Sequence, residues 1–183
     1  MIYPVTVFGD PILRKKAEPV TKDFKELKEF IQNMFETMYN SDGVGLAAPQ
    51  VGQAIRVFVI DTTTDEEGEP AGLRKAFINP KILEIYGEAW TLNEGCLSLP
   101  EIREDVLRPE FVRIKYQDDN FKEYEEVFSG FTSRVIQHEY DHLEGIMFVD
   151  YLNPLKKRIL KSKLTAITKG KVIPKYRIKI PGK

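Results

Sequence analysis

The sequence predicts an α+β fold in which antiparallel or mixed β-sheets surround a central helix, with a further helix at the C-terminus. Two observations lead to this prediction. Stretches with strand character lie in the middle of the chain, between residues 56 and 128, and stretches with helical character lie on either side of them. Strands and helices segregated along a chain are typical of α+β proteins. With 183 residues, we expect one domain, 1–183, in which 151–183 form a basic helix and tail.

The first predicted helix runs from about residue 24 to Asn40. Asp23 and Glu26 have the spacing of a capping box at its start. Its apolar side chains share one helical stripe, with Lys and Glu between them; they are Phe24, Leu27, Ile31, Met34, Phe35 and Met38. The segment that follows, 43–52, contains so much Gly and Pro that we expect no regular structure there.

Four stretches in the middle of the chain have the composition of strands. They are rich in β-branched and aromatic residues that partly alternate with polar ones, at 56–60, 76–84, 111–117 and 123–128. The polar, acidic stretch 62–75 between the first two is expected to be an exposed loop.

Two later helices have recognisable ends. Ser129 or Gly130 is suited to cap the start of one, and Gly145 fits the position just past its end. The last helix has Asn153 as its N-cap, Pro154 in its first turn and Gly170 beyond its end.

Composition places the chain among ordinary globular proteins, with 42% hydrophobic and 30% charged residues. The single cysteine excludes an internal disulfide and suits a reducing compartment. The N-terminus has no signal-peptide pattern, and no apolar run approaches the ~20 residues that span a bilayer. We therefore expect a cytoplasmic protein with no membrane partner and no DNA partner.

Charge is distributed unevenly. Residues 151–183 contain 11 Lys or Arg and no Asp or Glu, whereas the chain as a whole has a net charge of −1. Such a basic tail is suited to an anionic partner such as RNA, or it forms a solvated face that is attracted to the acidic remainder of the chain.

The only two histidines, His138 and His142, lie four residues apart. On a helix this spacing places both imidazoles on one face, one turn apart. The pattern His-Glu-x-x-His is a known half-site for a transition metal, and the enclosed Glu139 is placed to transfer protons. Histidines that merely pack in a core would share the same face, but the complete motif favours a metal site.

The third ligand decides the class of metal site. The metzincin pattern requires a histidine where Phe148 stands, and a thermolysin-type site requires a later carboxylate, although nothing acidic follows Asp150. Cys96 remains. It is either a small buried hydrophobe or, as we favour, the third ligand of a His₂Cys site with a position open for water.

A metal at such a site lowers the pKa of its bound water towards about 7, and Glu139 is placed to accept the proton. The Gln50 amide and the backbone N–H of Leu97 are candidate donors to a developing oxyanion.

Three segments together resemble the peptide deformylase family. They are Gly43 to Gln50 (GVGLAAPQ), Glu94 to Ser98 (EGCLS) and Gln137 to His142 (QHEYDH), and they occur in the family's order with no signature position changed. The opening VFGDPILR from Val7 is also similar to the family's N-terminus. The resemblance extends over about 2–170.

The resemblance implies removal of the formyl group from the N-terminal formyl-methionine of nascent polypeptides, with release of formate. It implies one divalent metal, usually Fe²⁺, with Zn²⁺, Ni²⁺ or Co²⁺ as alternatives, held by Cys96, His138 and His142. It assigns acid/base catalysis to Glu139 and oxyanion stabilisation to Gln50 and Leu97. Substrate-binding positions follow less directly: Val44, Gly45, Leu92, Phe131 and Val135 around the methionine, and Glu94 and Arg103 at the mouth of its pocket.

The resemblance further implies that Arg108 pairs with Asp141 and that the basic C-terminal helix contacts the ribosome. Two other functions remain compatible with the residues: a different His₂Cys metalloamidase or peptidase, and a ribosome- or RNA-binding module with a structural metal site.

Overall fold

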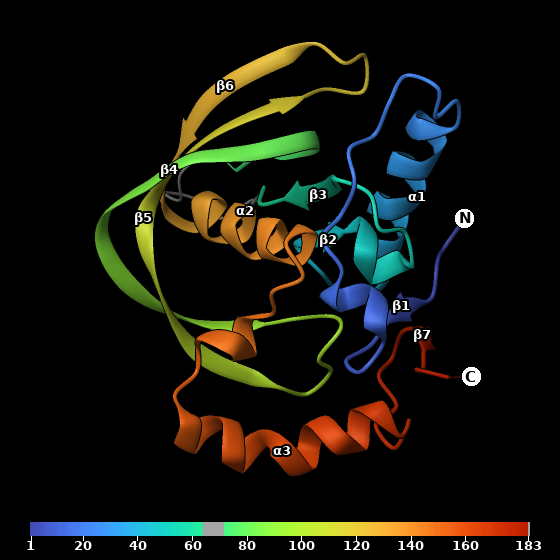
Figure 1. The fold of residues 1–183 in the computed structure, drawn as a ribbon, viewed down its shortest axis with the longest axis vertical. Helices are drawn as coiled ribbons and strands as arrows, with labels where there is room; N and C mark the ends of the chain where they lie inside the picture. The colour runs from blue at the N-terminus through green and yellow to red at the C-terminus, as the bar shows by residue number, and fades with distance from the viewer. Residues whose placement is uncertain (64–71, 183) are drawn as a thin grey trace.

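The fold is centred on a five-stranded antiparallel sheet that curves around one helix, α2 (Figure 1). The computed structural model describes residues 1–63 and 72–182. The strand order in the sheet is β2-β3-β4-β5-β6. The strands are β2 (Gly45–Ala47), β3 (Val57–Asp61), β4 (Arg74–Gly95), β5 (Arg103–Gln117) and β6 (Glu123–Phe128). The α+β prediction is confirmed.

The two longest strands exceed their predicted lengths. The sequence indicated strands at 76–84 and 111–117, whereas β4 and β5 pair along almost their whole lengths, out to Gly95 opposite Arg103. Register shifts interrupt the pairing between Tyr86 and Ala89 and at two earlier points. Such bulges bend a strand without ending it, so β4 and β5 continue beyond their predicted ends. The long strand brings Cys96, just after β4, to the end of α2.

The first helix, α1 (Leu27–Asn40), packs its apolar face against β2 and β3. The predicted capping box is not formed: Glu26 is the N-cap residue, and no side chain caps the helix. The reason is local, because Phe24 N–H donates to the Thr21 carbonyl and the backbone around Asp23 forms a turn.

The segment 43–52 is more regular than its composition indicated. It contains β2, whose residues pair with β3, and the 3₁₀ turn η2 (Ala48–Val51). Pairing with β3 supplies hydrogen bonds for this Gly-rich backbone, which local propensity alone does not provide. Gly52, with φ of +84°, ends η2.

The central helix α2 (Gly130–Leu143) follows its predicted ends: Ser129 is the N-cap residue, and Gly145 has φ of +73° just past Glu144. Buried residues on α2 pack against β3 and β5, and Figure 1 shows the helix enclosed by the curve of the sheet. The motif His-Glu-x-x-His therefore lies inside the molecule.

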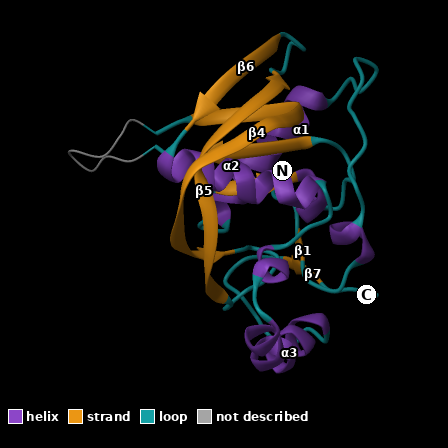
Figure 2. Cartoon of the chain, turned by 60° about the vertical axis from the view of Figure 1, so that its left-hand side comes forward, coloured by secondary structure: helices purple, strands orange, loops and turns teal. Residues whose placement is uncertain are grey.

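The C-terminal residues are packed onto the rest of the chain. After the 3₁₀ turn η3 (Phe148–Tyr151), α3 (Pro154–Thr168) begins at Asn153, whose side chain accepts the Lys156 N–H, as predicted. Figure 2 shows α3 beside one end of the sheet. Leu160 and Ile167 are buried in a cluster with η3.

Beyond α3, the chain returns to its own N-terminus. Residues of β7 (Ile178–Lys179) pair in parallel with β1 (Val5–Thr6), next to the 3₁₀ turn η1 (Pro11–Arg14). Most of the predicted acidic loop, 64–71, lies outside the described residues. Within the described ranges, no helix is both long and apolar enough to cross a membrane.

Candidate metal centre and substrate pocket

Three metal-binding side chains meet between the end of β4 and α2. One donor atom from each of Cys96, His138 and His142 lies within 4.8 Å of the others, and Cys96 Sγ is 3.3 Å from His142 Nε2. Bonds of about 2.3 Å to sulfur and about 2.0 Å to nitrogen at a tetrahedral angle separate two ligand atoms by about 3.5 Å. The spacing therefore fits a transition metal.

Electrostatics at the ligands also favours a cation. Burial lowers the pKa of His142 well below its ordinary value, so its imidazole is neutral, as a ligand must be. At His138 burial acts in the same direction, but hydrogen bonds to Cys96 and Glu94 outweigh it and raise the pKa well above the ordinary value. Positive charge is thus stabilised beside Cys96, and a divalent ion would supply it. The donor set and its surroundings fit one metal ion.

Glu94 orients His138. Its Oε2 lies 3.0 Å from His138 Nδ1, which leaves Nε2 for the metal. The carboxylate also pairs with Arg108, at 2.7 Å, and with Arg134, at 3.1 Å. Although burial raises the pKa of Glu94, its partners His138 and Arg108 lower it to about 2. The predicted place of Glu94, at the pocket mouth, is wrong: only 5% of the residue is exposed, because two arginines and a histidine enclose it.

The expected ion pair of Arg108 and Asp141 is confirmed, with Nη1 2.7 Å from Oδ2. Tyr151 donates a further hydrogen bond to the same carboxylate. Arg108 therefore connects β5 to both the strand and the helix that supply the ligands.

Glu139 is buried beside the ligands without a hydrogen-bond partner for Oε2 in the described part of the chain. Burial, with smaller contributions from the negative charges of Glu94 and Asp141, raises its pKa to about 7. The backbone of Gly45 packs against this carboxyl group so closely that a Cβ there would overlap it. A carboxyl group with a pKa near neutrality is suited to both accept and donate a proton.

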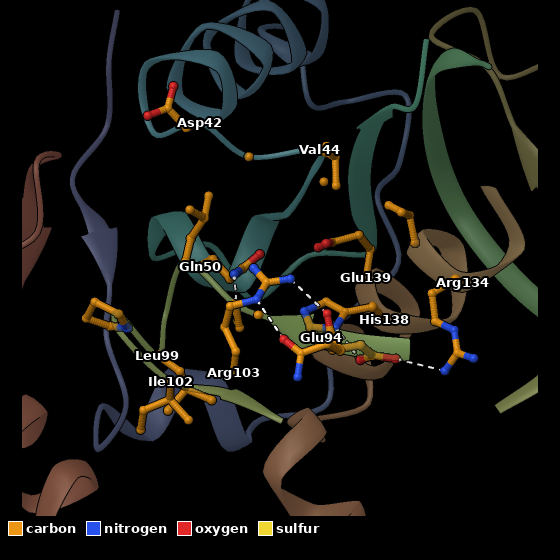
Figure 3. A pocket seen from close by; sticks show the side chains of 18 of the residues that line it. Asp42, Val44, Gln50, Glu94, Leu99, Ile102, Arg103, Arg134, His138 and Glu139 are labelled. Carbon is orange, nitrogen blue, oxygen red and sulfur yellow. Dashed lines mark hydrogen bonds and ion pairs between the residues drawn. The ribbon is translucent and has the colours of Figure 1, made fainter. Parts of the chain in front are cut away.

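Gln50 is fixed by its oxygen and presents its NH₂ group to the centre. Oε1 accepts the Ala47 N–H at 2.8 Å, and Nε2 lies 3.5 Å from Cys96 Sγ and 3.3 Å from Ser98 Oγ. Leu97 follows the ligand Cys96, and its N–H donates to none of the described residues. Figure 3 shows Gln50 and Glu139, on different elements, gathered around the space beside His138.

A pocket of about 420 Å³ opens at this centre. All the predicted substrate-binding residues line it: Val44, Gly45, Leu92, Glu94, Arg103, Phe131 and Val135. Val44 and Phe131 are each nearly half exposed, as expected for walls that a ligand would cover. Arg103 is exposed and is held by Asn93 through its side chain and carbonyl, so it does lie at the rim.

Sequence reasoning missed several residues around the pocket. Arg134 lies four residues before His138, a spacing that places it on the same helical face, but Figure 3 shows its guanidinium group turned towards Glu94 and away from the centre of the pocket. Ser98 lies within a recognised motif, yet its hydroxyl was not considered as a partner for Gln50. Tyr176 lines the pocket from the C-terminal segment, and no local motif marks it.

In this α+β fold, two histidines and a cysteine meet beside a pocket, and a buried carboxyl group lies next to them. This chemistry is that of a metal-dependent hydrolase. The comparisons with known proteins identify the family. The family model described as polypeptide deformylase matches residues 2–158, and the chain belongs to this family.

Relatives align over nearly the whole chain. A peptide deformylase of Christiangramia forsetii is 52% identical over 99% of this chain and 97% of its own length, and one of Flavobacterium johnsoniae is 53% identical over 98% and 96%. The crystal structure of a peptide deformylase from Legionella pneumophila superimposes with a TM-score of 0.82 at 37% identity, over 93% of this chain and 98% of that one. The fold and the family thus agree.

Proposed function

We propose that the Cys96, His138 and His142 centre is where this chain carries out its family's reaction: hydrolysis of the formyl group from the N-terminal formyl-methionine of nascent polypeptides. The whole chain, 1–183, acts as one catalytic domain in this proposal. The observation that carries it is Glu139, a buried carboxyl group with a pKa of about 7 beside three metal-binding atoms.

Substrate binding follows from the pocket. The methionine side chain enters between Val44, Leu92, Phe131 and Val135, where apolar surface is available to it. The backbone of Gly45 lies beside the formyl group, since the absence of a Cβ allows close approach. Arg103 at the rim faces the later part of the peptide.

The chemistry is amide hydrolysis. A divalent ion held by Cys96, His138 and His142 would supply a water molecule of lowered pKa at this place. Glu139 accepts a proton from that water and passes it to the amine nitrogen as the carbon–nitrogen bond breaks. The Gln50 amide and the Leu97 N–H donate to the formyl oxygen while negative charge develops there. The products are formate and a peptide with a free amine.

Metal identity is a separate proposal. One thiolate and two imidazoles bind Fe²⁺, Zn²⁺, Ni²⁺ and Co²⁺, and we propose Fe²⁺ as the native ion on the family resemblance. The metal content of the isolated protein tests this. The iron proposal requires that freshly isolated protein, prepared anaerobically, contains iron at about one equivalent; another metal at that stoichiometry would refute it.

The decisive experiment measures formate release from a short formyl-Met peptide by the Fe²⁺-loaded protein. A Cys96→Ala variant and an unformylated peptide are the controls. We expect rapid release by the wild type, none by the variant and no cleavage of internal peptide bonds. Internal cleavage would instead favour a different metalloamidase, and full occupancy by metal without any hydrolysis would favour a structural site.

We also propose that the reaction takes place in the cytoplasm and that the basic outer face of α3 contacts the ribosome. Arg158 and Lys161 are exposed on this helix, together with Leu155 and Ile159. Deleting 151–183 is unsuitable as a test, because Leu160, Ile167 and Tyr176 contact the rest of the molecule.

Replacing Arg158 and Lys161 by Glu leaves the buried side of α3, with Leu160 and Ile167, intact. We expect weaker co-sedimentation with ribosomes at low salt and unchanged turnover of a small formyl peptide. Equal co-sedimentation of the variant and the wild type would refute the ribosome proposal.

A further inference from the structure

The C-terminal segment reaches the active centre. After α3, Gly170 adopts φ of +66° and Lys171 N–H bonds back to the Ala166 carbonyl, which reverses the chain. The segment then runs to β7, whose pairing with β1 begins with Val5 N–H donating to the Arg177 carbonyl at 2.9 Å. Figure 1 shows this last segment (red) beside β1 (blue). Tyr176 is therefore held at a defined place, immediately before a paired strand.

Tyr176 contacts the stretch of chain that carries Cys96. Its hydroxyl donates to the Leu97 carbonyl at 2.8 Å, and its side chain lines the substrate pocket. Burial, together with the charge of Cys96, raises the pKa of Tyr176, so the hydroxyl remains a donor.

Each backbone carbonyl of residues 96–98 accepts a hydrogen bond. The Cys96 carbonyl accepts the Leu99 N–H at 2.9 Å, and the Ser98 carbonyl accepts the Phe8 N–H at 2.9 Å. Tyr176 provides the bond at Leu97 between them. The Leu97 N–H lies in the same peptide plane as the Cys96 carbonyl, which accepts the Leu99 N–H, and the Leu97 carbonyl lies in the next plane. The bond from Tyr176 holds that next plane, so it restrains the rotation about the Leu97 Cα that would let the first plane, and with it the N–H, change direction.

We infer that Tyr176 is a positioning residue for hydrolysis: by holding the Leu97 carbonyl, it aims the Leu97 N–H at the oxygen of the substrate's formyl group. This inference rests on the proposed function, in which that N–H stabilises the oxyanion. Tyr176 itself does not touch the reacting atoms. Preorganised donors of this kind act where charge develops in the transition state. Loss of the Tyr176 hydroxyl should therefore lower kcat more than it changes KM.

The test is Tyr176→Phe, which keeps the ring and removes only the hydroxyl. One lost hydrogen bond corresponds to about a 5- to 10-fold decrease in rate. We expect kcat for formyl-Met peptide to fall by that factor, with KM changed less than about twofold, metal content maintained and the melting temperature lowered by no more than about 2–4 °C. Tyr124→Phe is the matched control, because it removes a hydroxyl that donates to Asp118 at 3.1 Å, away from the pocket.

A second measurement distinguishes a role of Tyr176 in orienting the Leu97 N–H from a role in holding the C-terminal segment in place. If Tyr176 acts through Leu97, its effect depends on the other oxyanion donor, so Tyr176→Phe and Gln50→Ala together should not be additive in kcat. A Tyr176→Phe protein with wild-type kcat would overturn the inference, as would a loss confined to KM or to melting temperature. Failure of the wild type to release formate would instead overturn the proposed function.

Discussion

At the scale of single residues, Glu94 connects most of the charged groups behind the metal ligands. It accepts hydrogen bonds from Arg108 and Arg134 and orients His138, all away from solvent. A buried carboxylate is tolerated only with partners of this kind, and removing one partner typically costs about 3–5 kcal/mol. The same network fixes the tautomer of His138, so the requirements of stability and metal binding coincide at one side chain.

The side-chain amide of Gln50 is the proposed donor to the oxyanion whose removal is simplest to test. Because Ala47 N–H holds its oxygen, the NH₂ group has a fixed direction, and Gln50→Ala should keep the metal while lowering kcat by about 10²–10³. Metal analysis and steady-state kinetics on formyl-Met peptide measure both quantities. Gln53→Ala, at an exposed position immediately after the same segment, is the control. A Gln50→Ala rate near that of the wild type would exclude the oxyanion role.

Glu139→Gln tests the proton transfer. The amide has the size of the carboxyl group but accepts no proton, so we expect bound metal at one equivalent and a loss of about 10²–10⁴ in kcat. The exposed Glu125→Gln should behave as the wild type. Substantial turnover by Glu139→Gln would mean that another group acts as the base.

The sequence sufficed to predict that Cys96, His138 and His142 lie together, because each lies within a short motif with its own spacing. It did not place Glu94, whose surroundings depend on Arg108 and Arg134 arriving from β5 and α2, nor did it find Tyr176. These positions depend on contacts between residues far apart in the sequence, which local patterns do not record.

At the scale of elements, helices were predicted more closely than strands. Pro154 and Gly170 mark the ends of α3 through backbone geometry that belongs to those residues. Strand length, by contrast, depends on a partner: β4 continues to Gly95 because β5 lies beside it, and β2 exists because β3 pairs with it.

Gly145 lies just past the end of α2, the helix that carries both histidines. An alanine there would adopt φ of +73°, which costs about 1–2 kcal/mol, and its Cβ would come within 2.6 Å of the Arg14 carbonyl oxygen. Relief of that overlap adds about 1–3 kcal/mol. Gly145→Ala should therefore reduce the free energy of unfolding by about 2–5 kcal/mol.

Gly52→Ala is the matched control, because φ there is +84° but nothing lies within 4 Å of the added Cβ. It should lose only the backbone component, about 1–2 kcal/mol. Urea unfolding of both variants measures the difference, and equal losses would show that the Arg14 contact is irrelevant.

At the scale of the whole molecule, the two ends of the chain support the site together. β1 pairs with β7, Phe8 holds Ser98, and Arg14 on η1 pairs with Asp150 on η3, with Nη1 2.5 Å from Oδ2 and Nη2 3.2 Å from Oδ1. The Arg14 contact links the N-terminal segment to the residues that precede α3.

This last contact predicts a pH dependence of stability. Burial raises the pKa of Asp150, but the Arg14 guanidinium and the Met147 N–H outweigh it and lower the pKa below the ordinary value of 3.8. A lowered folded-state pKa means that Asp150 stabilises the fold above about pH 3.8 and that this stabilisation is lost as the pH falls through the lower value. Asp150→Asn should therefore be less stable than the wild type at pH 6, and the difference should shrink on acidification.

Urea unfolding at pH 6 and at successively lower pH values, down to the limit of two-state behaviour, measures this convergence. Asp119→Asn is the control, because that carboxylate, on a 43% exposed side chain, has only a 3.8 Å contact with Lys28 and a bond from the neighbouring Asn120 side chain. The Asp150 side chain is 39% exposed, so solvent screens the pair and the difference at pH 6 should remain small, below about 1 kcal/mol. A difference that widens on acidification would contradict the lowered pKa and assign the contribution of Asp150 to its neutral hydrogen bonds.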